Sequence, residues 1–377
     1  MQSLSRRQAL GLGLASLSTP WLTACGGGGD AAGPISRYSR LSLPTPVSSH
    51  TALSLGGTQV AIFGGSRADT VLSASVDYFD AATGHWTTQG EMSTGRSESC
   101  VVQVSSTVFF VHGGNRSLNG SQTAEWFDTA TGVTEPAVAS PSRLYHTATV
   151  LADGRILVAG GVSSEGYAGG VSPTLELWDP SDHSWRYAAQ PMIQARHAHT
   201  ATLMPDGKVL LTGGYSATGM ASSAELFDPA TETTQLISSA LLGRAGHGCV
   251  LLSNGDVLIA GGEMAGTQTQ AASPGAVRLV SGTWAVEALT SVPALGWVGA
   301  SVAANAQGQL IFFGGQDATT HAVAGAVSIG ASTGMQALES MPEARQWHSV
   351  TRLGSGQLLI LGGERDGALF SSALIFS

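Results

Sequence analysis

The sequence predicts an all-β protein that folds as a seven-bladed β-propeller. A unit ending in Gly-Gly occurs seven times, and the first glycines of successive pairs are separated by 49, 47, 53, 48, 53 and 48 residues. Each unit has room for four strands, and a four-stranded sheet must stack on neighbours to bury both faces, as a propeller blade does. The pairs are Gly64-Gly65, Gly113-Gly114, Gly160-Gly161, Gly213-Gly214, Gly261-Gly262, Gly314-Gly315 and Gly362-Gly363.

The first two strands of a unit are clearest between Arg143 and Gly161. Residues 146–151 are rich in β-branched residues, and Asp153-Gly154 is typical of a tight hairpin because glycine tolerates positive φ. Residues 156–159 are wholly apolar, which indicates a strand buried on both faces. Near-copies of this stretch run from Arg196 to Gly214 and from Arg244 to Gly262.

The third and fourth strands of a unit are marked by aromatic residues. A third strand ends in an aromatic-Asp step, as in Tyr78-Phe79-Asp80, Trp126-Phe127-Asp128, Leu177-Trp178-Asp179 and Leu226-Phe227-Asp228. The fourth strand often opens with tryptophan, as at Trp86, Trp185 and Trp284. Taken together, these positions and the glycine pairs resemble the kelch repeat over residues 35–377. The resemblance implies a kelch-type propeller.

The two ends of the chain are expected to close the ring within one blade. The last repeat stops in its third strand, at residues 373–377, and lacks a fourth. Residues 35–43 have the character of a fourth strand and precede the first unit. Pairing these two segments would complete the seventh blade and cover exposed strand edges.

Residues 1–24 are expected to be an export signal. The segment around Arg6-Arg7 resembles a twin-arginine motif, and the apolar stretch after it is too short to span a membrane comfortably. Residues 22–25, Leu-Thr-Ala-Cys, resemble a bacterial lipobox, in which Cys25 becomes the lipidated N-terminus; an ordinary secretory signal is the alternative. Residues 25–34 would then be a glycine-rich tether, and residues 35–377 the propeller.

Composition bounds the partners and the redox chemistry. A net charge of −9 with only 17 Lys and Arg argues against nucleic acid, because phosphate binding needs clustered basic residues.

Cys100 and Cys249 lie in inner strands of the second and fifth units, nearly opposite each other in a ring of seven. A disulfide needs Cα atoms within about 7 Å, so two buried free thiols are expected.

A ring of arginines is expected at one mouth of the central channel. Five units carry arginine three residues before the histidine position, and the sixth carries tryptophan there. Arginine binds carboxylates through a planar fork, so the ring would bind an acidic ligand and the tryptophan could stack on a sugar. In the alternative interpretation, the arginines pair with acids such as Glu125, Glu176 and Glu225. The candidate ligand-binding residues are Arg96, Arg143, Tyr145, Arg196, Arg244, Trp297, Arg345 and Trp347.

The histidines that recur at one position of the unit are expected to be hydrogen-bonding braces. Residues repeated at one blade position point in one repeated direction, whereas zinc needs convergent ligands, so no metal site and no cofactor is expected. Arg143-Leu-Tyr145-His146 is similar to a copper-ligand element of galactose oxidase and its relatives. The second histidine of that family, from a C-terminal domain, has no counterpart before Ser377. The recurring histidines are His50, His146, His199, His247 and His348.

The leading functional hypothesis is a binding module of the bacterial cell envelope. It would be held through Cys25 at the periplasmic face of the outer membrane or at the cell surface, and would act as a monomer. Its ligand would be a glycan, an acidic small molecule or another envelope protein. Exported N-acetylneuraminate epimerases are also similar, which implies a sugar-acid mutarotase as the alternative, with acids in the loops after Gly-Gly: Glu165, Glu263 and Glu364. No spacing singles out a catalytic residue.

Overall fold

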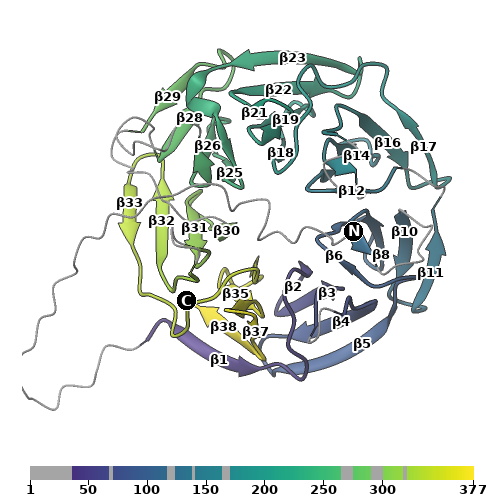
Figure 1. Ribbon diagram of the computed structural model, residues 1–377, viewed down its shortest axis with the longest axis vertical. Helices are drawn as coiled ribbons and strands as arrows, with labels where there is room; N and C mark the ends of the chain where they lie inside the picture. The colour runs from purple at the N-terminus through teal and green to yellow at the C-terminus, as the bar shows by residue number, and fades with distance from the viewer. Residues whose placement is uncertain are drawn as a thin grey trace, which may run out of the picture.

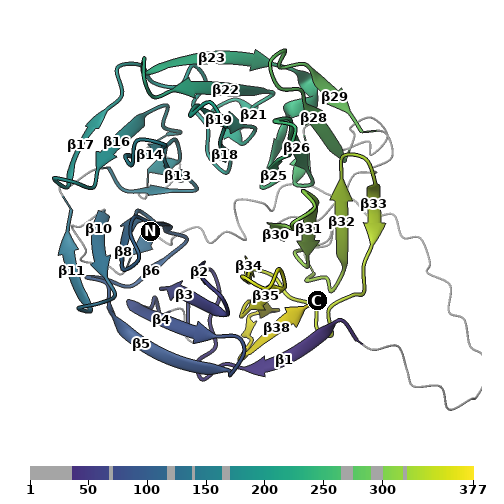
Figure 2. The same cartoon turned by 180° about the vertical axis from the view of Figure 1, so that it is seen from behind.

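The computed structural model describes residues 36–67, 71–116, 124–137, 141–163, 170–264, 275–289, 300–316 and 321–377. Seven four-stranded antiparallel sheets stand around a central axis, with one edge of each sheet facing the axis (Figures 1 and 2). The architecture is therefore the predicted seven-bladed β-propeller.

Each blade runs from an inner strand beside the axis to an outer strand at the rim. Blade 1 holds β2 (Thr51–Gly56), β3 (Gln59–Phe63), β4 (Ser75–Asp80) and β5 (His85–Glu91). Blade 2 holds β7 (Cys100–Gln103), β8 (Val108–His112), β10 (Ala124–Asp128) and β11 (Val133–Pro136). Blade 3 holds β13 (Thr147–Val150), β14 (Ile156–Ala159), β16 (Leu175–Asp179) and β17 (Ser184–Tyr187). Blade 4 holds β18 (Thr200–Leu203), β19 (Val209–Thr212), β22 (Ser223–Asp228) and β23 (Thr233–Ser238).

The remaining blades follow the same order. Blade 5 holds β25 (Gly248–Leu251), β26 (Val257–Ala260), β28 (Ala276–Leu279) and β29 (Val286–Ala288). Blade 6 holds β30 (Ser301–Ala304), β31 (Leu310–Phe313), β32 (Ala326–Gly330) and β33 (Gly334–Ala337). Blade 7 holds β34 (Ser349–Arg352), β35 (Leu358–Leu361), β38 (Ser372–Phe376) and β1 (Tyr38–Ser42).

Short strand pairs and one 3-10 turn lie on the face that carries the glycine pairs. The strand pairs are β6 (Arg96–Ser97) with β9 (Asn115–Arg116), β12 (Arg143–Leu144) with β15 (Val162–Ser163), β20 (Tyr215–Ser216) with β21 (Gly219–Met220), β24 (Arg244–Ala245) with β27 (Glu263–Met264), and β36 (Glu364–Arg365) with β37 (Ala368–Leu369). The turn is η3 (Ala240–Leu242), between blades 4 and 5.

The ring closes through strands from both ends of the chain. β1 pairs antiparallel with β38, and the register places Tyr38 opposite Phe376 and Ser42 opposite Ser372. The purple N-terminal strand lies along the yellow C-terminal strand in both views (Figures 1 and 2). The prediction that the N-terminal segment supplies the missing fourth strand of the last blade is confirmed.

The core lies between blades rather than within one. The second strand of a blade is buried on both faces, as β14 and β26 show, which explains their unbroken apolar sequences. One cluster joins Val60 and Phe79 of blade 1 to Leu359 of blade 7. Fully burying each such side chain contributes about 1.5–3 kcal/mol, so a blade depends on its neighbours for its stability.

The glycine pairs let neighbouring blades meet. Gly213 has a φ of +58°, and a Cβ on it would lie 2.3 Å from the carbonyl oxygen of Arg244 in the next blade. The amide of Gly214 donates to the same oxygen at 2.7 Å. Glycine is therefore needed at the first position both for its backbone angle and for the missing side chain.

Cys100 and Cys249 are both free thiols, as predicted, although each is half-buried rather than fully buried. The Cys100 thiol donates to the carbonyl oxygen of His146 at 3.1 Å, and the hydroxyl of Thr202 donates to Cys249 Sγ at 3.1 Å. Desolvation raises the pKa of Cys100 to about 12, which keeps it protonated and unreactive. Within the described residues, no helix is long and apolar enough to span a bilayer.

Candidate functional site

The five repeated arginines lie inside the blades and fasten the start of each inner strand. Their side chains are at most 2% exposed. In each, Nη1 donates to the carbonyl oxygen of the first glycine of the pair in the same blade, 17 residues further on: at 2.9 Å for Arg96, 3.1 Å for Arg143, 2.7 Å for Arg196, 3.4 Å for Arg244 and 2.9 Å for Arg345. The contact closes the loop between strands of one blade.

In blades 2, 3 and 4 a third-strand glutamate completes this contact. Arg96 Nε donates to Glu125 at 2.7 Å, and Arg196 Nη2 donates to Glu225 at 2.9 Å. Arg143 and Glu176 form the equivalent pair. The glutamates are fully buried, and desolvation lowers the pKa of Arg196. The interpretation that these arginines pair with acids is confirmed.

Blades 5 and 7 hold their arginines without that glutamate. In blade 5, where Val277 takes its place, Arg244 Nη2 donates to the carbonyl oxygen of Leu241 in η3 at 3.3 Å. In blade 7, Arg345 donates to Glu343 at 2.9 Å and lies 4.4 Å from the centre of the Phe370 ring. Burial lowers the pKa of both arginines to about 10, so both stay charged at neutral pH.

Blade 1 reverses the arrangement. Val47 stands where the other blades have arginine, and Asp77 stands at the third-strand acid position. Arg67, which follows the glycine pair, reaches Asp77 at 3.4 Å. Blade 1 thus keeps an arginine–acid contact, although its arginine comes from the loop after the glycine pair and not from the segment before the inner strand. In the sequence, this change was indicated by valine at position 47 in a unit that keeps an acid at position 77.

These contacts correct the expected geometry of the channel mouth. The guanidinium groups of Arg96, Arg143, Arg196, Arg244 and Arg345 point into the blades, so they do not form an open, anion-binding funnel. Trp297, the sixth member of the expected ring, and Glu165 lie outside the described residues. Cys25 lies outside them as well.

A different set of residues lies immediately before the inner strands, at the side of each blade that is nearest the central axis. We define the inner ring as the residue before the histidine position in each blade where the structure describes it, which is every blade except blade 6. In each case this residue is half-buried or exposed between two buried neighbours, and its φ lies between +52° and +62°. A left-handed backbone conformation is costly for residues other than glycine. The surrounding fold must therefore hold these residues in it. The inner ring is Ser49, Glu98, Tyr145, Ala198, Gly246 and Trp347.

Backbone hydrogen bonds connect the inner ring from blade to blade. The amide of Ser49 donates to the Trp347 carbonyl at 2.9 Å, and that of Glu98 to the Ser49 carbonyl at 3.0 Å. The amide of Ala198 donates to the Tyr145 carbonyl at 2.8 Å. These hydrogen bonds hold the described residues of the inner ring in a shared backbone frame, from which the side chains other than that of Gly246 project. Two of the predicted ligand-binding residues, Tyr145 and Trp347, belong to it.

Aromatic side chains of blades 3 and 4 stack beside the inner ring and end on a carboxylate of blade 5. The Tyr145 and His197 ring centres are 5.9 Å apart, and those of His197 and Tyr215 are 5.3 Å apart with nearly parallel planes. The Tyr215 hydroxyl donates to Glu263. We call these four residues the aromatic–acid cluster. Sequence reasoning missed His197 and Tyr215, because their juxtaposition depends on the spacing of blades.

We define the channel face as the inner ring, the residue after each glycine pair and the residue bridged to it. The described ionisable side chains of this face are Glu98, Glu263, Glu364 and His197, and none is Lys or Arg. Gln346 donates to Glu364 at 3.1 Å. Desolvation lowers the pKa of His197 to about 4, so it is neutral at pH 7. The channel face is therefore acidic.

The recurring histidines join neighbouring blades, as expected of braces. His199 Nε2 lies 3.0 Å from Thr147 Oγ1, and His50 Nε2 lies 2.7 Å from Ser349 Oγ. His146 meets the buried His112 of blade 2 at 3.0 Å, while Tyr145 contacts His197 in blade 4, so Tyr145 and His146 turn to different neighbours. Among the described residues no three His, Cys, Asp or Glu side chains are grouped to hold a metal ion.

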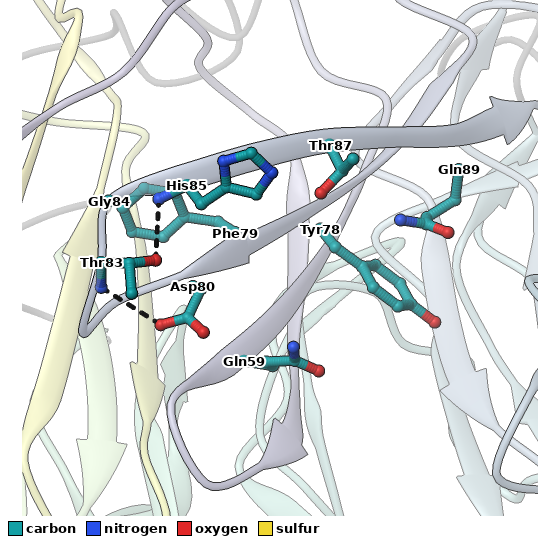
Figure 3. A pocket seen from close by; sticks show the side chains of 9 residues that line it. All are labelled: Gln59, Tyr78, Phe79, Asp80, Thr83, Gly84, His85, Thr87 and Gln89. Atoms are coloured by element: carbon teal, nitrogen blue, oxygen red, sulfur yellow. Dashed lines mark hydrogen bonds between the residues drawn. The ribbon is translucent and has the colours of Figure 1, made fainter.

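A groove of about 650 Å³ lies on the outer hairpin of blade 1, lined by residues such as Tyr78, Asp80 and His85 (Figure 3). Its carboxylate already serves the turn: Asp80 accepts from the amides of Ala82 at 2.8 Å and Thr83 at 3.3 Å. The Asp80 carboxylate is thus engaged by the backbone of its own turn, and we do not assign the groove a ligand.

Comparison with known proteins agrees with this architecture. The family model of the KLHDC2/KLHL20/DRC7 Kelch-repeats domain matches residues 49–262. Kelch-like protein 15 of Danio rerio is 27% identical over 233 residues, which cover 56% of this chain. The matched region spans 37% of that relative's length.

Proposed function

The chain belongs to the Kelch-repeat domain family, and from this premise we propose that it is a protein-binding module that takes its partner on the channel face. The observation that carries the proposal is the inner ring. It presents half-buried side chains from blades 1, 2, 3, 4 and 7 on a hydrogen-bonded frame. Kelch propellers are typically protein-binding modules, and a rigid frame with varied side chains suits that role because little ordering entropy is lost on binding.

The side chains of the channel face support a partner with both apolar and polar groups. Tyr145, Tyr215 and Trp347 are each half-buried, and aromatic residues of this kind dominate binding energy at protein interfaces. The buried arginines contribute indirectly, because they hold the loops from which these residues project. An acidic ligand receives less support than in the sequence hypothesis, since the described channel face carries no cationic side chain.

Glycan binding is the second candidate, favoured by the contiguous rings of Tyr145, His197 and Tyr215, of which the last two are stacked. Aromatic rings beside a carboxylate suit sugar rings and their hydroxyls as well as peptides. We further propose that residues 25–34 tether the propeller to the bacterial envelope through a lipidated Cys25. Incorporation of labelled fatty acid should occur in the full chain and be lost in Cys25→Ala; incorporation that persists in the variant would contradict the tether.

The binding proposal is tested by presenting the full chain to a random peptide array and to a glycan array. We expect peptides to bind, and Tyr145→Ala with Trp347→Ala to reduce their affinity by at least tenfold, the size expected for interface aromatics. Tyr187→Ala, which removes an aromatic that is 48% exposed on the outer strand β17, is the matched control. Peptide binding that depends on Tyr187 instead would contradict the proposal, and glycan binding lost with Tyr145 would favour the second candidate.

A further inference from the structure

The aromatic–acid cluster joins three consecutive blades into one surface. Tyr145 comes from blade 3, His197 and Tyr215 from blade 4, and Glu263 from blade 5. His197 is 5% exposed, whereas Tyr145, Tyr215 and Glu263 are each half-buried and reach the surface. The hydrogen bond from Tyr215 fixes Glu263 beside the ring stack. The carboxylate therefore has a defined position at the edge of an aromatic platform.

Among the described residues of the channel face, the side chains that carry charge at pH 7 are carboxylates. His197 is neutral at pH 7, because burial holds its pKa near 4. Glu98 and Glu364 add negative charge elsewhere on the channel face. The nearest repeated cations, Arg143, Arg196 and Arg244, are at most 2% exposed and donate to carbonyl groups inside their blades. A binding partner therefore meets carboxylates and aromatic faces.

We propose that the protein partner of the channel face places a lysine or arginine side chain against the carboxylate of Glu263, beside the ring of Tyr215. The inference rests on the proposed function, that this face binds a protein. A carboxylate gives a charge-assisted hydrogen bond to either cation, and the face of a tyrosine ring attracts a cation within about 6 Å. An acidic side chain at the same place would be repelled, which gives specificity.

The test uses the full chain and an array of random twelve-residue peptides, read at low and high salt. We expect bound peptides to be enriched in Lys or Arg, and their affinity to fall as salt rises. Glu263→Gln should weaken them by about tenfold, the size of one charge-assisted hydrogen bond. Glu135→Gln removes the same charge from a carboxylate that is 66% exposed on the outer strand β11 and should change nothing.

The outcomes separate the two proposals. Enrichment in basic residues that Glu263→Gln abolishes and Glu135→Gln leaves intact supports a cationic anchor. Peptides without basic enrichment whose binding is lost in Tyr145→Ala would overturn the cationic anchor and keep the channel face as the binding surface. Binding that neither Glu263→Gln nor Tyr145→Ala changes, or binding to glycans only, would overturn both.

Discussion

Replacing Glu225 by valine tests whether the arginine contacts stabilise the propeller. The change gives blade 4 the residue that blade 5 carries at Val277. Glu225 accepts hydrogen bonds from Arg196 Nη2 at 2.9 Å, from the amide of Gln194 at 2.8 Å and from the amide of Ile193 at 2.7 Å. In the variant both amides lose this acceptor, and Arg196 Nη2 keeps only the Ser223 hydroxyl, at 3.0 Å. Arg196, which is fully buried, would keep its charge without a counter-ion.

The expected loss is about 3–5 kcal/mol of unfolding free energy, since breaking a buried ion pair leaves one charge uncompensated. For a chain of this size, with an unfolding entropy of about 0.8 kcal/mol/K, that corresponds to a fall in Tm of roughly 4–6 °C. In blade 5 the Leu241 carbonyl oxygen in η3 accepts from Arg244 Nη2, and the Ser239 side chain caps that turn. Blade 4 has no described turn of this kind, so valine alone cannot be accommodated in the same way.

Thermal unfolding followed by circular dichroism measures the effect. Glu287→Val is the control, because its ion pair with Arg278 is exposed and contributes less than about 1 kcal/mol. The double variant Glu225→Val with Arg196→Met should be more stable than Glu225→Val alone, since no unpaired charge remains. If Glu225→Val has the same Tm as the Glu287→Val control, the reasoning is refuted.

Three further predictions concern the backbone, the histidines and ring closure. Gly213→Ala should lower the unfolding free energy by several kcal/mol, because its Cβ would meet the Arg244 carbonyl. Gly246→Ala, whose Cβ would have nothing within 4 Å, should lower it by only about 1 kcal/mol for its positive φ. Equal losses of unfolding free energy in chemical denaturation would contradict this. Burial lowers the pKa of His348 to about 3, so this histidine takes up its proton at a higher pH in the unfolded chain than in the folded one. The unfolding free energy should therefore fall as pH drops below about 6.5, by about 1.4 kcal/mol per pH unit for this residue. His348→Ser should remove that share of the slope between pH 6 and 4, and an unchanged slope would count against it. Deleting residues 36–42 should lower Tm sharply because β38 loses its outer partner and keeps only its pairing with β35. An unchanged melt would disprove closure by β1.

The fold was predictable because its constraints are local and repeated. Gly213 and the other first glycines need positive φ and no side chain, and this need is written into the sequence at each blade. The third-strand aromatic-Asp step likewise marks a turn in which Asp80 accepts two backbone amides. Closure by β1 followed from counting strands at both ends.

The site was less predictable because it depends on which way side chains point and which blades meet. The sequence correctly placed Arg143 and Arg196 just before the inner strands. Their spacing alone does not distinguish a guanidinium that enters the blade from one at the channel mouth. The accompanying glutamates were the signal for burial. The replacement for glutamate in blade 5, a carbonyl of η3, has no sequence pattern. Tyr215 and Glu263 lie 48 residues apart, and only the assembled ring brings them together.

The most direct test of the channel face as the binding surface is to map where a bound peptide lies. A peptide selected on the array, carrying a photoreactive residue next to its basic residue, is cross-linked to the full chain, and the linked sites are identified by mass spectrometry. We predict links to the inner ring and the aromatic–acid cluster, foremost to Tyr145 and Tyr215. Links concentrated on the outer strands, such as β17 around Tyr187, would contradict the account.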